Sequence, residues 1–475
     1  MVTIYKRYFP MIACMCGFNT MAQPFTPSVA SFITDSATNI ALVDAKIIDG
    51  TGAPSKGNQT VLIADGRITR IGKVQDIAIP KDADIINCTG KTIIPGMVML
   101  HEHLYYTMLL GNYFNLAEMP FSFPRMYLAG GATTIRTAGS IEPQTDLAIK
   151  RMINEGKLPG PDIDVTAPYI ERKGWDIPSL NIIKDSAEAA ATVNFWADKG
   201  CTSFKMYVHA TKEDLAAVVR EAHKRKLKVT GHLGTLTYRE AAELGIDDIE
   251  HGFFASSDFD HRKKENQFDP ERADQALMDL DVNSLEMKSL IQFLIKKNVA
   301  LTSTLTVLAP YTNSEIVPGG GDSALLPEVR KMVSDRWQHY QHGDSEQLAL
   351  FKKELIWEKQ FYDAGGLLVC GTDPTGSGNT LAGYGSRKAI ELLVEGGFAV
   401  TQAIKIASLN GARYLNREST IGTIEAGKSA DLVLIDGDPE KNLADIRKTQ
   451  IVFKRGIGFD SKKLFDSVKG KVGLN

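Results

Sequence analysis

Short apolar runs alternate with helical patterns through the middle of the chain, between residues 93 and 415. In the helical stretches, such as 212–224 and 238–244, apolar residues recur three or four positions apart. Alternating strands and helices predict a parallel sheet, and eight such units are typical of an α/β protein with a closed (β/α)8 (TIM) barrel. The eight expected strands are Met97–Leu100, Thr133–Ile135, Ile163–Thr166, Ser203–Val208, Lys228–Thr230, Asp248–Glu250, Val299–Thr304 and Leu367–Gly371.

An open, doubly wound sheet is the alternative architecture. It is disfavoured because no glycine-rich nucleotide-binding loop follows the first expected strand. Two connections are unusually long, 253–297 and 305–366. Connections of that length are often lids or binding loops. Both also contain helical patterns, so helices that pack on the surface without a role in binding are an equal expectation.

The two ends of the chain lack the strand–helix alternation of the middle. Short runs rich in β-branched residues, separated by turn-forming residues, occupy residues 39–74, and the same pattern occurs at 422–453. Neither end alone is rich enough in apolar residues to bury a core. We therefore expect residues 30–92 and 420–475 to form one small β-sandwich domain, and residues 93–419 to form the barrel domain.

The first residues predict an export signal. Lys6 and Arg7 precede a mostly apolar run over 8–18, and small residues follow up to Ala22. This order is typical of a signal peptide, residues 1–22, and predicts a periplasmic or secreted protein. A lipoprotein signal ending at Cys14 is disfavoured because only six residues, 8–13, would form its apolar region.

Composition narrows the functional classes. The chain carries 54 basic and 57 acidic residues with no strongly basic stretch, so nothing favours a nucleic-acid partner. Outside the leader no run of 18 apolar residues occurs, so no membrane span is expected. Five cysteines in 475 residues are too few for a disulfide framework. Once the leader is removed, Cys88, Cys201 and Cys370 remain, and we expect them to be small buried residues.

Chemically reactive side chains gather at the ends of the expected strands. In barrel enzymes the catalytic groups converge at the carboxyl ends of the strands. Two histidines two apart in a strand point to the same side. One His-x-His pair is weak evidence for a metal, but a full set from five strands is strong evidence. The set is His101, His103, Lys205, His232, His251 and Asp373.

Nitrogen and oxygen ligands without thiolates favour zinc, with manganese, cobalt, iron and nickel as alternatives. Lys205 is the unusual member, because a protonated amine would be repelled by divalent ions. A lysine carboxylated by carbon dioxide becomes an anion that can bridge two metals. The alternative is a structural lysine paired with Glu102 or Glu250.

The motifs together resemble the amidohydrolase superfamily in its binuclear, carboxylated-lysine form. The resemblance covers nearly all of the chain after the leader, and it is closest to the branch that holds imidazolonepropionase-like proteins and prolidase-like dipeptidases. One departure is Met99, where the family often has aspartate, which leaves the support of His101 unassigned. The motifs are, in order, IIPGMVMLHEHL, GATTIRTAGS, TSFKMYV, VTGHLG, DIEHG, CGTDPTG and GTIEAGKSADLVLIDGDP.

The resemblance implies a role for each ligand. His101, His103 and Asp373 would hold a more buried metal ion, and His232 and His251 a more exposed one. N6-carboxylated Lys205 and a hydroxide would bridge both ions. Asp373 would accept the proton of the attacking hydroxide and hand it to the leaving amine.

The predicted activity is metal-dependent hydrolysis of an amide C–N bond in a small, carboxylate-bearing substrate, such as a dipeptide or an N-acyl amino acid. A cyclic amide, as in imidazolonepropionase-like proteins, or a lactone is the alternative within the same chemistry. Alternatives of another class are a non-catalytic barrel scaffold and a solute-binding protein. Candidate substrate contacts are Arg136, Tyr169, Tyr207 and His209, and assembly into a homo-oligomer is compatible with the sequence.

Overall fold

The structure, a computed structural model, describes residues 25–110, 113–175, 177–312, 315–341, 345–375 and 378–473. The predicted signal peptide, residues 1–22, and the cysteines Cys14 and Cys16 lie outside the described residues, so export stays a prediction. Within the described part of the chain, no helix has both the length and the hydropathy needed to cross a bilayer. Cys88, Cys201 and Cys370 are buried and free, as predicted.

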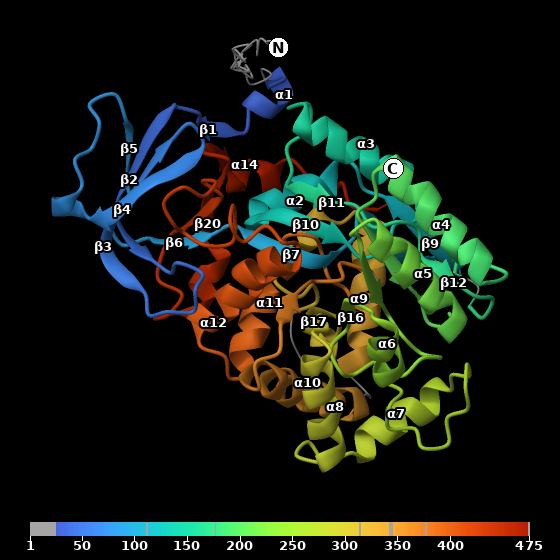
Figure 1. The fold of residues 1–475 in the computed structure, drawn as a ribbon. Helices are drawn as coiled ribbons and strands as arrows, with labels where there is room; N and C mark the ends of the chain where they lie inside the picture. Colours follow the sequence, from blue (N-terminus) through green and yellow to red (C-terminus); the bar gives the residue numbers. More distant parts are fainter. Residues whose placement is uncertain are drawn as a thin grey trace, which may run out of the picture.

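Every one of the eight strands expected in the middle of the chain is present, close to its predicted bounds. They belong to two sheets with parallel pairing, which lie at the centre of the molecule (Figure 1). One sheet contains β7 (Met97–Glu102), β10 (Ala132–Thr137) and β11 (Asp162–Asp164). The other contains β12 (Ile170–Glu171), β13 (Asn181–Ile182), β14 (Ser203–Met206), β15 (Lys228–Gly231), β16 (Asp248–Glu250), β17 (Ala300–Ser303) and β18 (Leu368–Cys370).

Backbone hydrogen bonds join these two sheets at both sides. After β11, the Thr202 N–H donates to Val165 O at 2.9 Å, and the Ala167 N–H donates to Ser203 O at 3.0 Å. After β18, the N–H groups of Thr372 and Asp373 donate to His101 O at 3.1 and 2.9 Å. The second junction places the residues that follow β18 directly beside the first histidine of β7.

Helices surround the parallel strands, and local sequence signals set their bounds. Helix α5 begins after Thr211 and α6 after Thr237, and each has a capping box that satisfies the free N–H groups of the first turn. The predicted helices 212–224 and 238–244 are therefore confirmed at both ends. The helices are α1 (Pro27–Ala30), α2 (Ser122–Gly130), α3 (Pro143–Asn154), α4 (Ser186–Lys199), α5 (Lys212–Lys224), α6 (Tyr238–Leu244), α7 (Pro270–Asp279), α8 (Leu285–Lys296), α9 (Pro327–Gln341), α10 (Ser345–Asp363), α11 (Tyr384–Glu395), α12 (Val400–Lys405), α13 (Gly411–Tyr414) and α14 (Ser461–Asp466).

The two long connections are largely helical. Residues 253–297 contain α7 and α8, and residues 305–366 contain α9 and α10. A hairpin that the sequence did not predict, β8 (Tyr105–Leu110) with β9 (Tyr113–Glu118), follows the His-x-His motif directly. These segments all follow the carboxyl ends of central strands, where the candidate site lies.

Strands from both ends of the chain share one nine-stranded sheet, in the blue and red part of Figure 1. The two ends meet where Ile93 of β6 pairs with Leu434 of β19, and a common apolar core includes Val61 and Phe453. Asp65 and Gly66 form the turn that joins β3 to β4. The strands are β1 (Ile33–Asp35), β2 (Asn39–Ile47), β3 (Lys56–Ala64), β4 (Arg67–Lys73), β5 (Asp84–Asn87), β6 (Thr92–Pro95), β19 (Leu432–Ile435), β20 (Thr449–Lys454) and β21 (Ile457–Asp460).

Candidate metal centre

The end of β7 carries two buried histidines that face one carboxylate. His101 and His103 are 1% and 2% exposed. Asp373 Oδ1 lies 3.0 Å from His103 Nε2 and 3.7 Å from His101 Nε2. One ligand atom from each of the three residues lies within 4.8 Å of the others. Two imidazole nitrogens and a carboxylate oxygen at that spacing fit a divalent metal ion.

The other expected ligands lie around the same point. The imidazole of His251 lies between those of His101 and His232, with ring centroids 4.5 and 4.4 Å away. Lys205 is buried, and its charge acts on His101, His232 and Asp373. The structure thus gathers all six side chains in one cluster, and their roles as ligands stay predictions.

Burial disfavours protonation of three of the candidate histidine ligands. It lowers the pKa of His101 to about 4 and that of His232 to about 3, and it lowers the pKa of His251 well below its usual range. Burial also lowers the pKa of Lys205. Lone pairs on neutral imidazoles are available to metals at neutral pH. A lowered amine pKa enlarges the neutral fraction of Lys205, which is the form that reacts with carbon dioxide.

Glu250 supplies the support for His101 that Met99 cannot. Its Oε2 contacts His101 Nδ1, while its Oε1 accepts hydrogen bonds from Arg136 at 2.9 Å and Thr230 at 2.5 Å. A carboxylate on one imidazole nitrogen fixes the tautomer and directs the other nitrogen to the metal. The supporting acid therefore comes from β16, across the site from β7. From the sequence, Glu250 was expected only as an alternative partner of Lys205.

Arg136 lies beneath the cluster, which corrects the expectation that it contacts substrate. It is 1% exposed, and it donates to Leu100 O at 2.7 Å and to Asp248 at 2.9 Å as well as to Glu250. Although burial opposes its charge, Glu250 and Asp248 raise the pKa of the guanidinium above its usual range. Arg136 does lie at the end of the expected strand Thr133–Ile135, but its side chain points to the buried carboxylates of Asp248 and Glu250. We reassign Arg136 to the support of Glu250.

Two of the candidate ligands have left-handed backbone. His251 has φ +68° and Asp373 has φ +46°. Such conformations persist in residues other than glycine only when the surroundings fix them, and they cluster at functional sites. Next to Asp373, the backbone N–H and the hydroxyl of Thr372 both donate to Glu102. Burial raises the pKa of that glutamate to about 8.

Aromatic residues flank the cluster on one side. The hydroxyls of Tyr105 and Tyr169 are hydrogen-bonded at 2.6 Å, and the ring of Tyr207 lies 5.3 Å from that of His232. Trp175 contacts the rings of both Tyr207 and His209. Tyr169 and Tyr207 therefore lie beside the cluster and His209 lies further out, and their contact with substrate stays a prediction. Tyr105 was not predicted as a site residue, although strand alternation from His103 pointed to it.

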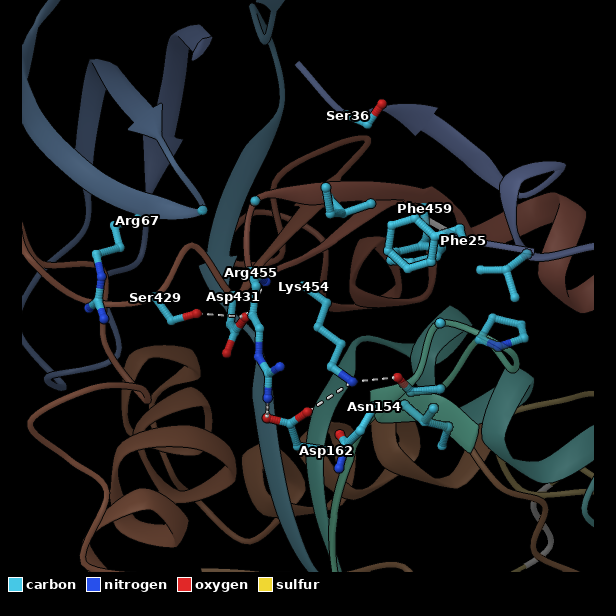
Figure 2. A pocket seen from close by; sticks show the side chains of 18 of the residues that line it. Phe25, Ser36, Arg67, Asn154, Asp162, Ser429, Asp431, Lys454, Arg455 and Phe459 are labelled. Carbon is cyan, nitrogen blue, oxygen red and sulfur yellow. Dashed lines mark hydrogen bonds and ion pairs between the residues drawn. The ribbon is translucent and has the colours of Figure 1, made fainter. Parts of the chain in front are cut away.

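A separate cavity of about 820 Å³ lies between the terminal sheet and the segment 153–162 (Figure 2). Asp162 in its wall forms ion pairs with Lys454 at 2.9 Å and Arg455 at 2.7 Å. Phe25 and Phe459 meet edge to face at its rim. None of the expected site residues lines this cavity, so its size does not make it the candidate site.

Comparison with known proteins finds imidazolonepropionases among the relatives of this chain. An imidazolonepropionase of Vibrio cholerae serotype O1 is 35% identical over 98 residues, which are 20% of this chain and 24% of that protein. The chain thus spans about a quarter of the length of the first curated relatives it matches. An imidazolonepropionase of Clostridium tetani is 21% identical over 391 residues, 80% of this chain and 84% of that protein.

The fold has solved counterparts. The structure of a Xaa-Pro dipeptidase with bound methionine in the active site superposes with a TM-score of 0.65 and 19% identity. The superposition covers 89% of this chain and all of that one. The sequence pattern of the amidohydrolase family matches residues 92–457, which include every strand and every candidate ligand of the central sheets. The resemblance inferred from the motifs is thereby confirmed, and the chain belongs to the amidohydrolase family.

Proposed function

We propose that this protein is a hydrolase that uses divalent metal ions to cleave a carbon–nitrogen amide bond. The observation that carries the proposal is the convergence of His101, His103 and Asp373, whose ligand atoms lie within 4.8 Å of one another. Membership of the amidohydrolase family supports it. The retention of every ligand type argues against a non-catalytic scaffold.

The donor set is suited to two ions, with zinc as the preferred metal. His101, His103 and Asp373 would hold one ion, and His232 and His251 the other. Lys205, carboxylated on Nζ, would contact both, and the lowered pKa of its amine supports that modification. When bound, the ions supply an acidified water as the nucleophile and a Lewis acid for the substrate carbonyl.

Asp373 is the proposed proton carrier. The neighbouring His101 and His103 hold its pKa below the usual range although burial opposes this, so it is an ionised acceptor at neutral pH. It would accept the proton of the attacking water and return it to the leaving nitrogen. Tyr169 and Tyr207 would orient the substrate through their hydroxyls, and His209 would meet its carboxylate.

The preferred substrates are dipeptides and N-acyl amino acids. Two divalent ions outweigh the charges of a carbamate, Asp373 and a hydroxide, which leaves a positive site that suits an anionic substrate. The likeness to a Xaa-Pro dipeptidase supports this choice. Cyclic amides are the alternative, since imidazolonepropionases are among the matched relatives. Lactones are a further alternative within the same chemistry.

We also infer that the two central sheets form one closed (β/α)8 barrel, residues 93–419. The hydrogen bonds at both junctions support closure. The shared core of the terminal strands supports a small β-sandwich domain made of residues 30–92 and 420–475. A crystal structure in which either junction is open would contradict the barrel.

Removal of residues 1–22 on export is a further proposal. The basic residues, apolar run and small residues of the leader support it. Mass measurement of the protein isolated from its native host is expected to find Gln23 at the N-terminus. Retention of Met1 in protein from the cell interior would contradict export.

The activity test compares substrate classes and site variants in protein loaded with zinc and bicarbonate. Lys205→Ala and Asp373→Asn are expected to lower kcat/KM for the best amide substrate by about 10²–10⁴-fold. Asp198→Asn on the exposed face of α4 is the matched control and should leave the rate unchanged. Full activity and metal content in either site variant would refute the assignment. Faster cleavage of imidazolones or lactones than of dipeptides and N-acyl amino acids would move the substrate to the alternatives.

A further inference from the structure

Helix α10 places two acids in the interior, on one face of the helix. Glu354 and Glu358 are 0% and 1% exposed and lie four residues apart. Among the described residues, neither carboxyl group forms an ion pair with a lysine or arginine. Two neighbouring carboxyl groups buried without a cation cannot both ionise. Burial raises the pKa of Glu358 to about 8 and that of Glu354 well above its usual range, so the pair is protonated at neutral pH.

The acid pair lies against the turn that follows β16. Glu354 Oε1 accepts a hydrogen bond from the Phe253 N–H at 2.9 Å. On the same turn, the Tyr238 hydroxyl donates to Gly252 O at 2.9 Å. A Cβ atom at position 252 would lie 1.9 Å from Glu354 Oε1, so only glycine permits this close approach. The turn is therefore held from two sides by side chains of distant segments.

This turn carries His251, one of the candidate ligands. Both His251 (φ +68°) and Gly252 (φ +59°) have left-handed backbone, which a residue with a side chain rarely adopts. The imidazole lies against the rings of His101 and His232, and the Thr304 hydroxyl is 3.0 Å from its Nδ1. Its orientation thus depends on whatever fixes the backbone at 251–253.

We propose that Glu354, supported by Glu358, is a positioning residue for His251. By binding the Phe253 N–H, Glu354 holds the 251–253 turn in the conformation that directs the imidazole between His101 and His232. This gives the long connection 305–366 a role in building the site. The inference rests on the proposed metal centre, and its test separates the two.

Two substitutions at position 354 isolate the hydrogen bond. Glu354→Leu keeps the approximate size but removes the acceptor, whereas Glu354→Gln keeps an acceptor oxygen and the neutral form. Glu354→Leu is expected to weaken binding of one of the two metal ions by about 10–100-fold, the usual effect of losing an outer-shell partner. Dialysed protein would then retain about one ion per chain in place of two. Glu354→Gln should retain both.

Leu355→Ala is the matched control for loosened packing of α10. Leu355 is adjacent in sequence, but its Cδ2 faces Gly396 at the end of α11, away from the turn. The variant is expected to lower the melting temperature while keeping both metal ions. Equal metal loss in Leu355→Ala and Glu354→Leu would show a general loss of packing and overturn the positioning role.

A second readout needs no metal. Amide hydrogen exchange at residues 252–254 of the metal-free protein reports whether the turn is held. We expect exchange at least about tenfold faster in Glu354→Leu, and wild-type exchange in Glu354→Gln and Leu355→Ala. Unchanged exchange and metal affinity in Glu354→Leu would refute the inference. A wild-type protein that binds two ions but hydrolyses no amide would refute the proposed activity alone.

Discussion

The candidate ligands on β7 and those in the turns after β16 and β18 are held in different ways. His101 lies in β7 and His103 is the first residue after it; neither has left-handed backbone, so the alternation of the strand sends both imidazoles to one side. His251 and Asp373 come after their strands have ended and have left-handed backbone. The direction of the first pair is set by a strand, and a distant acid contacts only the imidazole of His101. In the second pair, distant acids bind the backbone of the turns themselves.

The supports of the two pairs differ in charge. Beneath β7, His101 contacts Glu250, which is paired with Arg136, so the support is an ionic network. Beneath the turns, Glu102 and Glu354 accept backbone hydrogen bonds as buried acids with raised pKa values. Substitutions that remove a charge should therefore disturb the support of His101, which is ionic, more than the supports of His251 and Asp373, which are neutral acids.

The largest effect is expected from Arg136→Met, which removes the cation of the ionic network. Asp248 and Glu250 would be left buried and uncompensated, so unfolding in denaturant should show a loss of about 3–5 kcal/mol. Arg220→Met, with a side chain that is 57% exposed, is the control and should be near neutral. Wild-type stability combined with a raised KM would restore Arg136 as a substrate contact.

Glu250→Gln should have an intermediate effect, which acts on metal binding by His101 and His103. The amide keeps the shape but no longer draws a proton to His101 Nδ1 as strongly, so metal affinity or activity should fall about 10–100-fold. Titration of metal-free protein with zinc measures this. Glu243→Gln, exposed on α6, is the control. Unchanged zinc affinity would break the claimed link between Glu250 and His101.

The smallest effect is a pH dependence of stability at the buried acid pair. The folded pKa of Glu358 is about 8, above the unfolded value near 4.5, so the folded state holds a proton that the unfolded state releases. Its contribution to stability is therefore lost as pH rises through this window. In metal-free protein, Glu358→Gln should gain a few degrees in melting temperature relative to wild type between about pH 5 and 8. A constant difference across that range would contradict the raised pKa.

The central strands and the strand-end ligands were predictable because both follow local periodicity. His101, Lys205 and His232 could be placed from apolar runs alone. The supports could not be predicted in this way. Glu250 contacts a histidine 149 residues earlier in the chain, and Glu354 contacts a peptide 101 residues earlier. No spacing in the sequence encodes such pairs, since they exist only once the strands are assembled.

Arg136 illustrates the limit of arguing from position. Arg136 was expected to contact substrate because it is a polar residue at the end of a strand. Its partners are instead carboxylates inside the site, those of Asp248 and Glu250. Asp248 and Glu250 lie two residues apart in the expected strand that precedes His251, and alternation alone puts both on one side. A buried pair of acids can ionise only beside a buried cation, and that requirement was the available signal for the role of Arg136.

The most direct test of the metal centre is the number of metal ions per chain, measured by elemental analysis of protein purified without added metal or chelator. The account predicts about two divalent ions per chain, falling in Lys205→Ala and Asp373→Asn, since both residues would contact the ions. A chain that binds no divalent ion, even after addition of zinc with bicarbonate, would contradict it.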